Sequence, residues 1–475
     1  MLAAAVVRLL VFAVTSNEPG DAEARAVEGA LTYESPHLIY FGIWLPLHRY
    51  TVALFMIPFS DPVLAGKMLS LFAGVAALFP FYHLTRLYFD RRTTLLAGGM
   101  FVIFGNHVGL SALVMTETPF VFLSLWGVLL FAREKRSSSP RMAGFCRAAL
   151  LLALAGGFRQ EAWQLSGILM LWMLLDSRIR RYVVPYAAIA FSPFLYWTIG
   201  NMVAGEGLLF GLLGVASAKE AELAYVERSA LVNVVKWIWI FLQSPGPLLC
   251  LFGLVGMQQA LVRRPGELPL AAIALLMLAP YVLLSILKPA WAPQHRYVVF
   301  AAILLLPYAA AGFWLLLGSS RLAMPAVAVL LTASIATQAL AYGRHSSAYL
   351  PVKDHQQADL EVSRWLQANL SPLDRLVVED ADWRAPGIVL RSESYRRPYR
   401  MLLGTPSPER LAQLVRAVDA TVIVLRSPPT RWSGMEPSEH ELVFRSAEYL
   451  VFRRKPDLES TTLPLPLFCT GSSQL

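Results

Sequence analysis

The sequence predicts a polytopic α-helical membrane protein with a small soluble α/β domain at its C-terminal end. Of its 475 residues, 56% are hydrophobic and only 15% are charged, whereas soluble proteins carry about 25% charged residues. The apolar residues form runs of about 20, which is the length that crosses a bilayer. From about residue 352 these runs give way to amphipathic and strand-like patterns, which indicates a separate soluble part.

About eleven apolar runs are predicted as transmembrane helices, each ended by charged residues or by proline and glycine. They lie near residues 1–15, 64–84, 93–114, 117–132, 142–158, 162–176, 182–203, 233–257, 268–287, 297–317 and 321–342. The apolar segment 50–59 is too short to span, so we expect it to be re-entrant or interfacial.

The basic residues predict the orientation, because cytoplasmic loops are enriched in Lys and Arg. A cytoplasmic N-terminus places every basic cluster in a cytoplasmic loop and the acidic loops outside. The net charge of +9 therefore indicates contact with membrane lipid and not with nucleic acid. An odd number of spans then puts the C-terminal domain on the extracytoplasmic side. The basic clusters are Arg86, Arg91, Arg92, Arg133, Lys135, Arg136, Arg141, Arg178, Arg180, Arg181, Arg263, Arg264 and Arg321.

Three segments divide the chain: a membrane domain (1–350), an extracytoplasmic α/β domain (351–456) and a disordered tail (457–475). The α/β domain is expected to contain a helix at 354–370 and another beginning at Ser407-Pro408-Glu409. Strands are predicted at 375–379, 421–425, 441–444 and 449–452.

Four groups of ionisable residues lie at predicted span ends on the outer side, where charge is costly and therefore suggests function. The first is a predicted loop with two carboxylates, Asp21 and Glu23. Either could act as a general base or help to hold a cation. The simpler interpretation is a solvated acidic loop.

The second group is Glu117, which lies between two apolar spans. It could be an active-site carboxylate, or an acid that is stabilised by the helix N-terminus.

The third group contains Arg159 and Glu161 at a hinge after Gly156-Gly157. The guanidinium suits bidentate contact with a phosphate, and a salt bridge between the two residues is the alternative.

The fourth group is His295, Arg296 and Tyr297, immediately before a late span. It fits a clamp for a lipid phosphate, and equally an interfacial anchor.

The sequence contains no pattern of a nucleotide-binding loop, a serine hydrolase or a zinc protease. Cys146, Cys250 and Cys469 match no metal or disulfide spacing. No metal ligand is assigned and no cofactor is predicted.

The order of these motifs resembles the GT-C superfamily of membrane glycosyltransferases. The acidic motif comes first, followed by the Glu117-Thr118-Pro119-Phe120 element, the Arg159–Trp163 turn and His295-Arg296-Tyr297. The segment from Asp61 to Ser70 also looks like the entry to the second span of these proteins. The protein mannosyltransferase-like bacterial branch (family 39-like) and the lipid A aminoarabinose transferases are the most similar members.

The resemblance implies transfer of a sugar, with inversion, from a polyprenyl-phosphate donor to a lipid, glycan or protein acceptor. The reaction would take place on the extracytoplasmic side of the plasma (inner) membrane of a bacterium. The resemblance makes Asp21 or Glu23 the base and Glu117 a second active-site carboxylate. Family members often have an Asp-Glu pair in the first loop, whereas Ala22 separates the two acids in this chain.

When the roles of the family's residues are carried over one by one, Arg159, Arg296 and His295 would contact the phosphate of the donor, with Tyr297 beside them. Glu161 would orient Arg159.

Two other function classes are compatible with the sequence. A transporter or lipid flippase predicts ionisable groups near the bilayer midplane, where Gly105-Asn106-His107 interrupts a span. A non-catalytic envelope assembly protein would use the C-terminal domain to recruit partners.

Overall fold

The fold was analysed in a computed structural model of the chain. The structure describes residues 1–15, 20–37, 44–203, 229–263, 266, 269–287, 294–318, 323–345, 354–380, 384–397, 399–403, 411, 415–416, 418–426 and 439–455.

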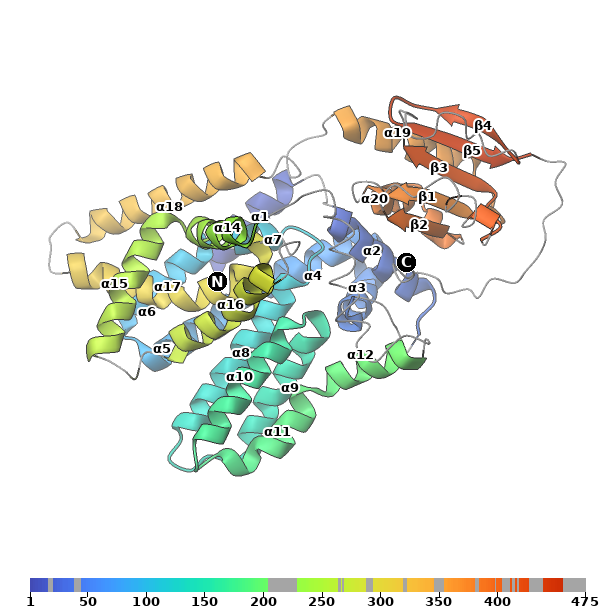
Figure 1. Cartoon of the computed structure of the whole chain (residues 1–475). Coiled ribbons are helices and arrows are strands. Elements are labelled where there is room, and N and C mark those ends of the chain that lie inside the picture. Colours follow the sequence, from blue (N-terminus) through green and yellow to red (C-terminus); the bar gives the residue numbers. More distant parts are fainter. Residues whose placement is uncertain are drawn as a thin grey trace.

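The part before residue 346 is helical (Figure 1). The first helices are α1 (Leu2–Val14), α2 (Gly20–Glu34), α3 (Pro46–Phe59), α4 (Pro62–Ala76), α5 (Leu78–Tyr88), α6 (Arg91–Val102), α7 (Gly105–Leu110) and α8 (Glu117–Arg136). Then come α9 (Met142–Phe158), α10 (Glu161–Leu175), η1 (Arg180–Tyr182), α11 (Val183–Ala190) and α12 (Ser192–Val203). The last are α14 (Ala230–Gln243), α15 (Pro247–Arg263), α16 (Pro269–Leu287), α17 (His295–Leu317) and α18 (Ala323–His345).

Four helical segments in the described residues are long and apolar enough to cross a membrane: Pro62–Tyr88, Arg180–Val203, Pro269–Leu287 and His295–Leu317. The bent pair α14 and α15 is a fifth candidate, and α1, α9, α10 and part of α18 are shorter apolar helices. The chain is thus rich in apolar helices, as the sequence predicts, while the number of eleven spans is not confirmed.

Two predicted spans are wrong as single helices. The run at 233–257 is divided between α14 and α15, which bend by 92°. The bend lies at Ser244-Pro245-Gly246-Pro247, where Gly246 has a φ of 96° that favours glycine. The run at 93–114 likewise stops at Val102 and resumes as the six-residue helix α7.

The predicted acidic loop after the first span is also wrong, because residues from Gly20 onward form helix α2. Its first turn carries Asp21 and Glu23, and carboxylates there are favoured by the helix dipole. Segment 50–59 belongs to helix α3.

Helix α17 lies at the centre of the helical part, where most of its apolar stretch is buried. It crosses α15 closely: a Cβ at Gly312 would lie 2.0 Å from the Phe252 carbonyl oxygen. Small residues allow such an approach between apolar helices. The polar N-terminus of α17 is therefore held by packing along the rest of that helix.

The C-terminal part contains a mixed five-stranded sheet in the order β2-β1-β3-β5-β4. Strands β2 and β3 run parallel to β1, and β5 runs antiparallel to β3 and β4. The sheet is accompanied by α19 (Asp354–Asn369), α20 (Ala385–Arg391) and η3 (Ser394–Arg396). We call residues 354–455 the C-terminal unit. The strands are β1 (Leu376–Asp380), β2 (Tyr399–Leu403), β3 (Val422–Arg426), β4 (His440–Arg445) and β5 (Tyr449–Arg454).

Four of these strands overlap those expected from the sequence, and β2 was not expected. The helix start at Ser407-Pro408-Glu409, the boundary at residue 350 and the tail after residue 456 lie outside the described residues.

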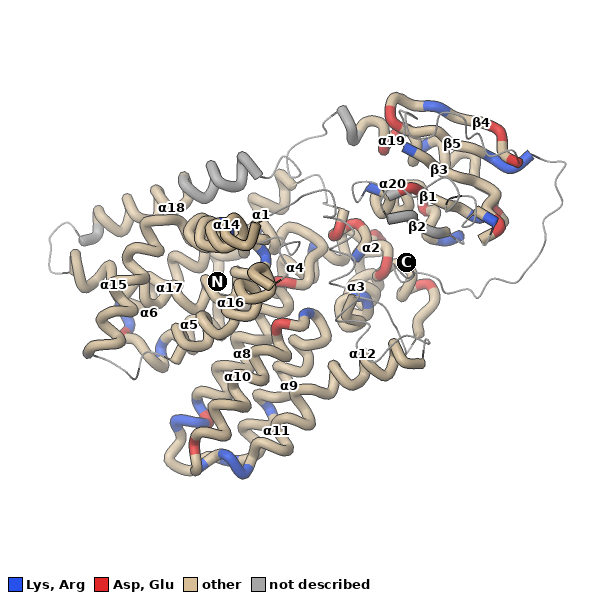
Figure 2. The backbone as a smooth tube through the Cα atoms, viewed as in Figure 1, with Lys and Arg blue, Asp and Glu red and all other residues tan. Residues whose placement is uncertain are grey.

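Helix α2 lies between the other helices of the helical part and the C-terminal unit (Figure 1), and it contacts α3, α4 and α20. In Figure 2 the basic residues at the ends of α8 and α11 lie far from the C-terminal unit.

Candidate active site

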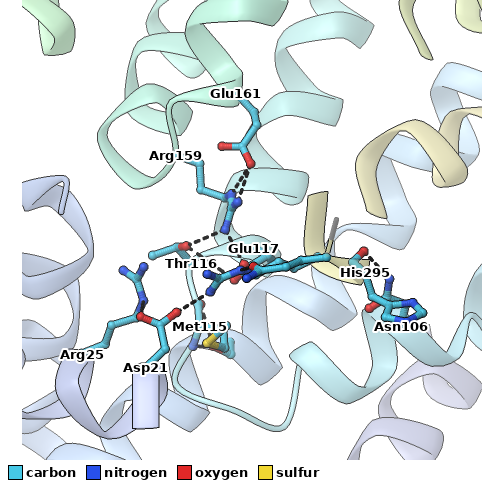
Figure 3. Close-up of polar contacts among 12 residues, drawn as sticks. Asp21, Arg25, Asn106, Met115, Thr116, Glu117, Arg159, Glu161 and His295 are labelled. Carbon is cyan, nitrogen blue, oxygen red and sulfur yellow. Dashed lines mark hydrogen bonds and ion pairs between the residues drawn. The ribbon is translucent and has the colours of Figure 1, made fainter. Parts of the chain in front are cut away.

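Four helix N-termini meet at one place and bring charged residues together (Figure 3). Asp21 lies in the first turn of α2, Glu117 begins α8, Glu161 begins α10, and Arg296 is the second residue of α17. We call this set the carboxylate–arginine cluster; its members are Asp21, Arg25, Glu117, Arg159, Glu161 and Arg296.

Asp21 joins α2 to α17. Its carboxylate accepts a hydrogen bond from Nη1 of Arg296 and lies 3.5 Å from Nε of Arg25. Nε of Arg296 donates to the side-chain oxygen of Gln294 at 2.8 Å. Burial alone would raise the pKa of Asp21, but the charges of Arg25 and Arg296 outweigh it and hold that pKa well below its usual range. In this state Asp21 is an ionised carboxylate with its negative charge neutralised by arginine.

Arg159 lies between α9 and α10 and is bonded to two carboxylates. Its Nε donates to Glu161 at 2.9 Å, and Nη2 bonds the same carboxylate oxygen. Nη1 bonds Glu117 and also Oγ1 of Thr116, the latter at 3.3 Å. All three residues of this triad have at most 8% of their surface exposed. The pairing of Arg159 with Glu161 was an alternative in the sequence analysis, whereas the bond to Glu117 was not expected.

Tyr297 connects the two arginine systems. Its ring centre lies 5.7 Å from the guanidinium carbon of Arg159 and 5.6 Å from that of Arg296. Beside it is a cavity of about 10 Å³, which is space for about one water molecule. Glu117, Glu161, Arg296 and Tyr297 line its polar side, and Phe120, Val121, Met277, Val299, Phe300 and Ala301 line the rest.

Two predicted site residues lie apart from this cluster. Glu23 faces the C-terminal unit and pairs with Arg391 of α20. The carbonyl of His295 accepts a hydrogen bond from Nδ2 of Asn106 at 2.8 Å. In Figure 3 this pair lies at the opposite end of the view from Asp21. The structure therefore places Asp21 in the cluster and Glu23 outside it. The sequence alone does not distinguish the two acids in this way.

Arg25 was missed by the sequence analysis. It lies four residues after Asp21, which is the spacing of a helical ion pair, and its guanidinium carbon is 5.0 Å from the centre of the Trp44 ring. This spacing is present in the sequence, but it indicates an ion pair only in a helix, and the polarity of the segment predicts a loop. Within the described ranges, no group of three His, Cys, Asp or Glu side chains is placed to hold a metal ion.

The cluster is suited to exchange one anion for another. Its three carboxylates and three guanidinium groups balance in formal charge. The helix N-termini around it add partial positive charge, which favours anions such as carboxylate or phosphate. A phosphate that enters can take over arginine bonds that carboxylates hold in this state.

No protein-family model matches the sequence, and no curated protein sequence matches it significantly. The fold is nevertheless similar to solved structures. ArnT from Cupriavidus metallidurans bound to undecaprenyl phosphate has a TM-score of 0.69 at 12% identity, over 96% of this chain and 98% of that one.

Two further structures share the fold. The oligosaccharyltransferase of Archaeoglobus fulgidus has a TM-score of 0.54 at 14% identity, over 89% of this chain and 68% of that chain. The mycobacterial arabinofuranosyltransferase AftD has a TM-score of 0.56 at 15% identity, over 95% and 41%. All three are GT-C glycosyltransferases, so the predicted resemblance is confirmed at the level of the fold. Together with the apolar helices, this fold identifies an integral membrane protein.

Proposed function

We propose that this protein is a glycosyltransferase that moves a sugar from a polyprenyl-phosphate donor to an acceptor on the extracytoplasmic side. The observation that carries the proposal is the carboxylate–arginine cluster at four helix N-termini, beside a small cavity with a polar and an apolar side. A lipid phosphate needs cationic groups and helix N-termini for its head, next to apolar surface for its chain. The undecaprenyl phosphate bound to ArnT, which has the same fold, supports this donor class.

Asp21 is the proposed base and Arg296 the proposed contact for the donor phosphate. When the phosphate takes the Arg296 guanidinium, Asp21 loses part of the charge that keeps its pKa low. Its half-buried position then raises that pKa, which makes the carboxylate a better proton acceptor. Binding of the donor thus activates the base.

The chemical step balances as a single displacement. Asp21 takes the proton of the acceptor hydroxyl or amine, whose oxygen or nitrogen forms a bond to the anomeric carbon of the sugar. The bond from that carbon to the phosphate oxygen breaks, and polyprenyl phosphate leaves with the electron pair. Arg159 and Arg296 stabilise the charge that grows on the leaving phosphate. Glu161 orients Arg159, Glu117 is the second active-site carboxylate, and Tyr297 positions both arginines.

The proposed side of the membrane is supported by the distribution of charge. Arg133, Lys135 and Arg136 are in the last turn of α8, and Arg180 and Arg181 precede α11. This basic end lies far from the C-terminal unit (Figure 2), as expected if the basic end is cytoplasmic. We propose the plasma membrane of a bacterium as the location.

The test measures loss of label from polyprenyl-phosphate sugars by the protein in lipid, with membrane extract as the acceptor source. Wild type should consume the donor, and Asp21→Asn should lower the rate at least about 100-fold, the contribution of a general base. Asp61→Asn is the matched control. Asp61 caps α4 by accepting from the Leu64 amide at 2.6 Å, and asparagine caps equally well.

No consumption of any labelled donor by wild type would contradict the proposal. It would favour the transporter or the assembly protein instead. If the Asp21→Asn variant is active, the protein is still a transferase, but Asp21 is not its base.

A further inference from the structure

Helix α2 has a second set of ion pairs, on the side that faces the C-terminal unit. Glu23 pairs with Arg391 at the end of α20, and its side chain is only 8% exposed. Near the end of α2, Oε1 of Glu34 accepts a hydrogen bond from Nε of Arg396 at 2.9 Å. The C-terminal unit therefore holds α2 at both of its ends.

The first of these contacts is closely packed. A Cβ at Gly387 would lie 2.4 Å from Oε2 of Glu23 and 2.6 Å from Nη1 of Arg391. Any larger residue at this position would have to displace one of the two charged groups. Glycine at 387 thus permits α20 to approach α2 with the ion pair between them.

The two acids at the start of α2 point in different directions. Residues two positions apart on an α-helix are separated by about 200° around its axis. Asp21 pairs with Arg296 of α17 on one side, and Glu23 pairs with Arg391 on the other. A rotation of α2 that lengthens one pair must move the other. The two arginines therefore restrain the helix together with its packing on α3, where Nε of Arg49 donates to Oγ1 of Thr32 at 3.1 Å.

We infer that Arg391, acting through Glu23, is a positioning residue that sets the rotation of α2 and hence the place of Asp21. This inference rests on the proposed role of Asp21 as the base. It gives the C-terminal unit a part in catalysis although none of its described residues belongs to the carboxylate–arginine cluster. Glu23 is then the acid that anchors the helix, not the acid that takes the proton.

Gly387→Ala is the sharpest test, because the added methyl meets only the ends of two flexible side chains. Alanine is also a better helix former than glycine, so α20 itself should persist. We expect Gly387→Ala and Arg391→Ala to lower kcat about 10- to 100-fold, the scale of a misplaced catalytic group. KM for the donor that wild type consumes should change less than about threefold, since the phosphate contacts lie on other helices.

A charge exchange provides the rescue. Glu23→Lys alone should be as slow as Arg391→Ala, and Glu23→Lys combined with Arg391→Glu should recover most of the kcat. Arg445→Glu is the control: it is an exposed arginine on β4, at the edge of the sheet opposite β2. It should match wild type.

Hydrogen exchange of the α2 amides provides a readout that does not depend on activity. Exchange should be faster in Gly387→Ala and Arg391→Ala than in wild type and in Arg445→Glu. Faster exchange with unchanged kcat would overturn the inference, because the contact would then be structural only. Unchanged exchange would overturn it too. If wild type transfers no sugar, the proposed function fails, and exchange alone then reports whether the C-terminal unit holds α2.

Discussion

Asp21 and Arg296 form an ion pair that joins the first turn of α2 to the first turn of α17. Both side chains keep some exposure, 22% for Asp21 and 25% for Arg296. The pair is therefore reachable by a substrate, in contrast to the nearly enclosed triad of Glu117, Arg159 and Glu161. This difference separates the accessible part of the cluster from its enclosed part.

Loss of Arg296 should change the pH dependence of transfer. The charges of Arg25 and Arg296 hold the pKa of Asp21 low against the effect of burial, so the carboxylate stays ionised down to strongly acidic pH. In Arg296→Gln the effect of burial gains weight and the pKa rises. The acid limb of kcat/KM, which reports groups of the free enzyme, should move to higher pH. An unmoved acid limb would show that Asp21 is not the group that titrates.

Loss of Arg159 should destabilise the protein as well as inactivate it. Arg159→Ala leaves two buried carboxylates without their shared cation, and a broken buried pair costs about 3–5 kcal/mol. We expect a lower denaturation temperature in detergent, partly restored when Glu161→Gln is added to Arg159→Ala. No recovery in the double variant would argue against charge burial as the cause.

Arg8 and His107 should respond unequally to substitution. Arg8 is fully buried, and its Nη2 lies 2.8 Å from Nδ1 of His107. Arg8→Met replaces a buried charge with an apolar chain of similar length and leaves only the His107 ring nitrogen without this contact, so stability should fall by about 1 kcal/mol. His107→Leu should cost about 3 kcal/mol, because it leaves the guanidinium buried without that partner. Thermal denaturation of both variants measures the difference, and equal losses would contradict this account.

The crossing of α15 and α17 should not tolerate a side chain at Gly312. A Cβ there would lie 2.0 Å from the backbone oxygen of Phe252, which cannot rotate away. Gly312→Ala should therefore lose about 1–3 kcal/mol of stability, as overpacked cores do. Gly253→Ala on α15 is the control, since nothing lies within 4 Å of its Cβ position. The measurement is the melting temperature of each variant. Equal melting temperatures for Gly312→Ala and Gly253→Ala would contradict the close crossing.

Tyr449 should stabilise the C-terminal unit through its hydroxyl group. That hydroxyl donates to Oδ1 of Asp359 at 2.7 Å, and Arg384 bonds the other carboxylate oxygen at 3.0 Å. Tyr449→Phe removes one bond and should cost about 1 kcal/mol. Arg384→Ala removes the cation from Asp359 and the nearer of two arginines from Glu448, and should therefore allow faster proteolysis of the unit. We expect the unit to be cleaved faster in Arg384→Ala than in Tyr449→Phe, and equal proteolysis rates for the two variants would contradict this expectation.

Parts of the site could be predicted because local sequence signals encode them. Glu117 follows Thr116 and precedes Pro119, which marks a helix start, and Glu161 follows Arg159 at a glycine hinge. Both acids do begin helices. The bond between Arg159 and Glu117 could not be predicted, because it depends on how α8 and the α9–α10 turn pack together.

The failures have physical causes as well. Helix α2 is a polar helix that is largely buried against other parts of the protein, so its hydropathy resembles that of a loop. The bend between α14 and α15 was hidden because both arms are apolar and a hydropathy window averages across Pro245 and Gly246. The choice between Asp21 and Glu23 depended on the rotation of α2, which only tertiary contacts determine.

Under the inferred role of Arg391, the order of synthesis also determines when the protein can become active. Arg296 lies 275 positions after Asp21, and Arg391 lies 368 positions after Glu23. A ribosome adds about 5–20 residues per second, so Glu23 must wait at least about 18 s for Arg391. Until the C-terminal unit emerges and folds, the chain has its membrane helices, but the proposed base, Asp21, lacks the contact that we infer to position it. Premature termination before residue 391 should therefore leave an inserted but inactive protein.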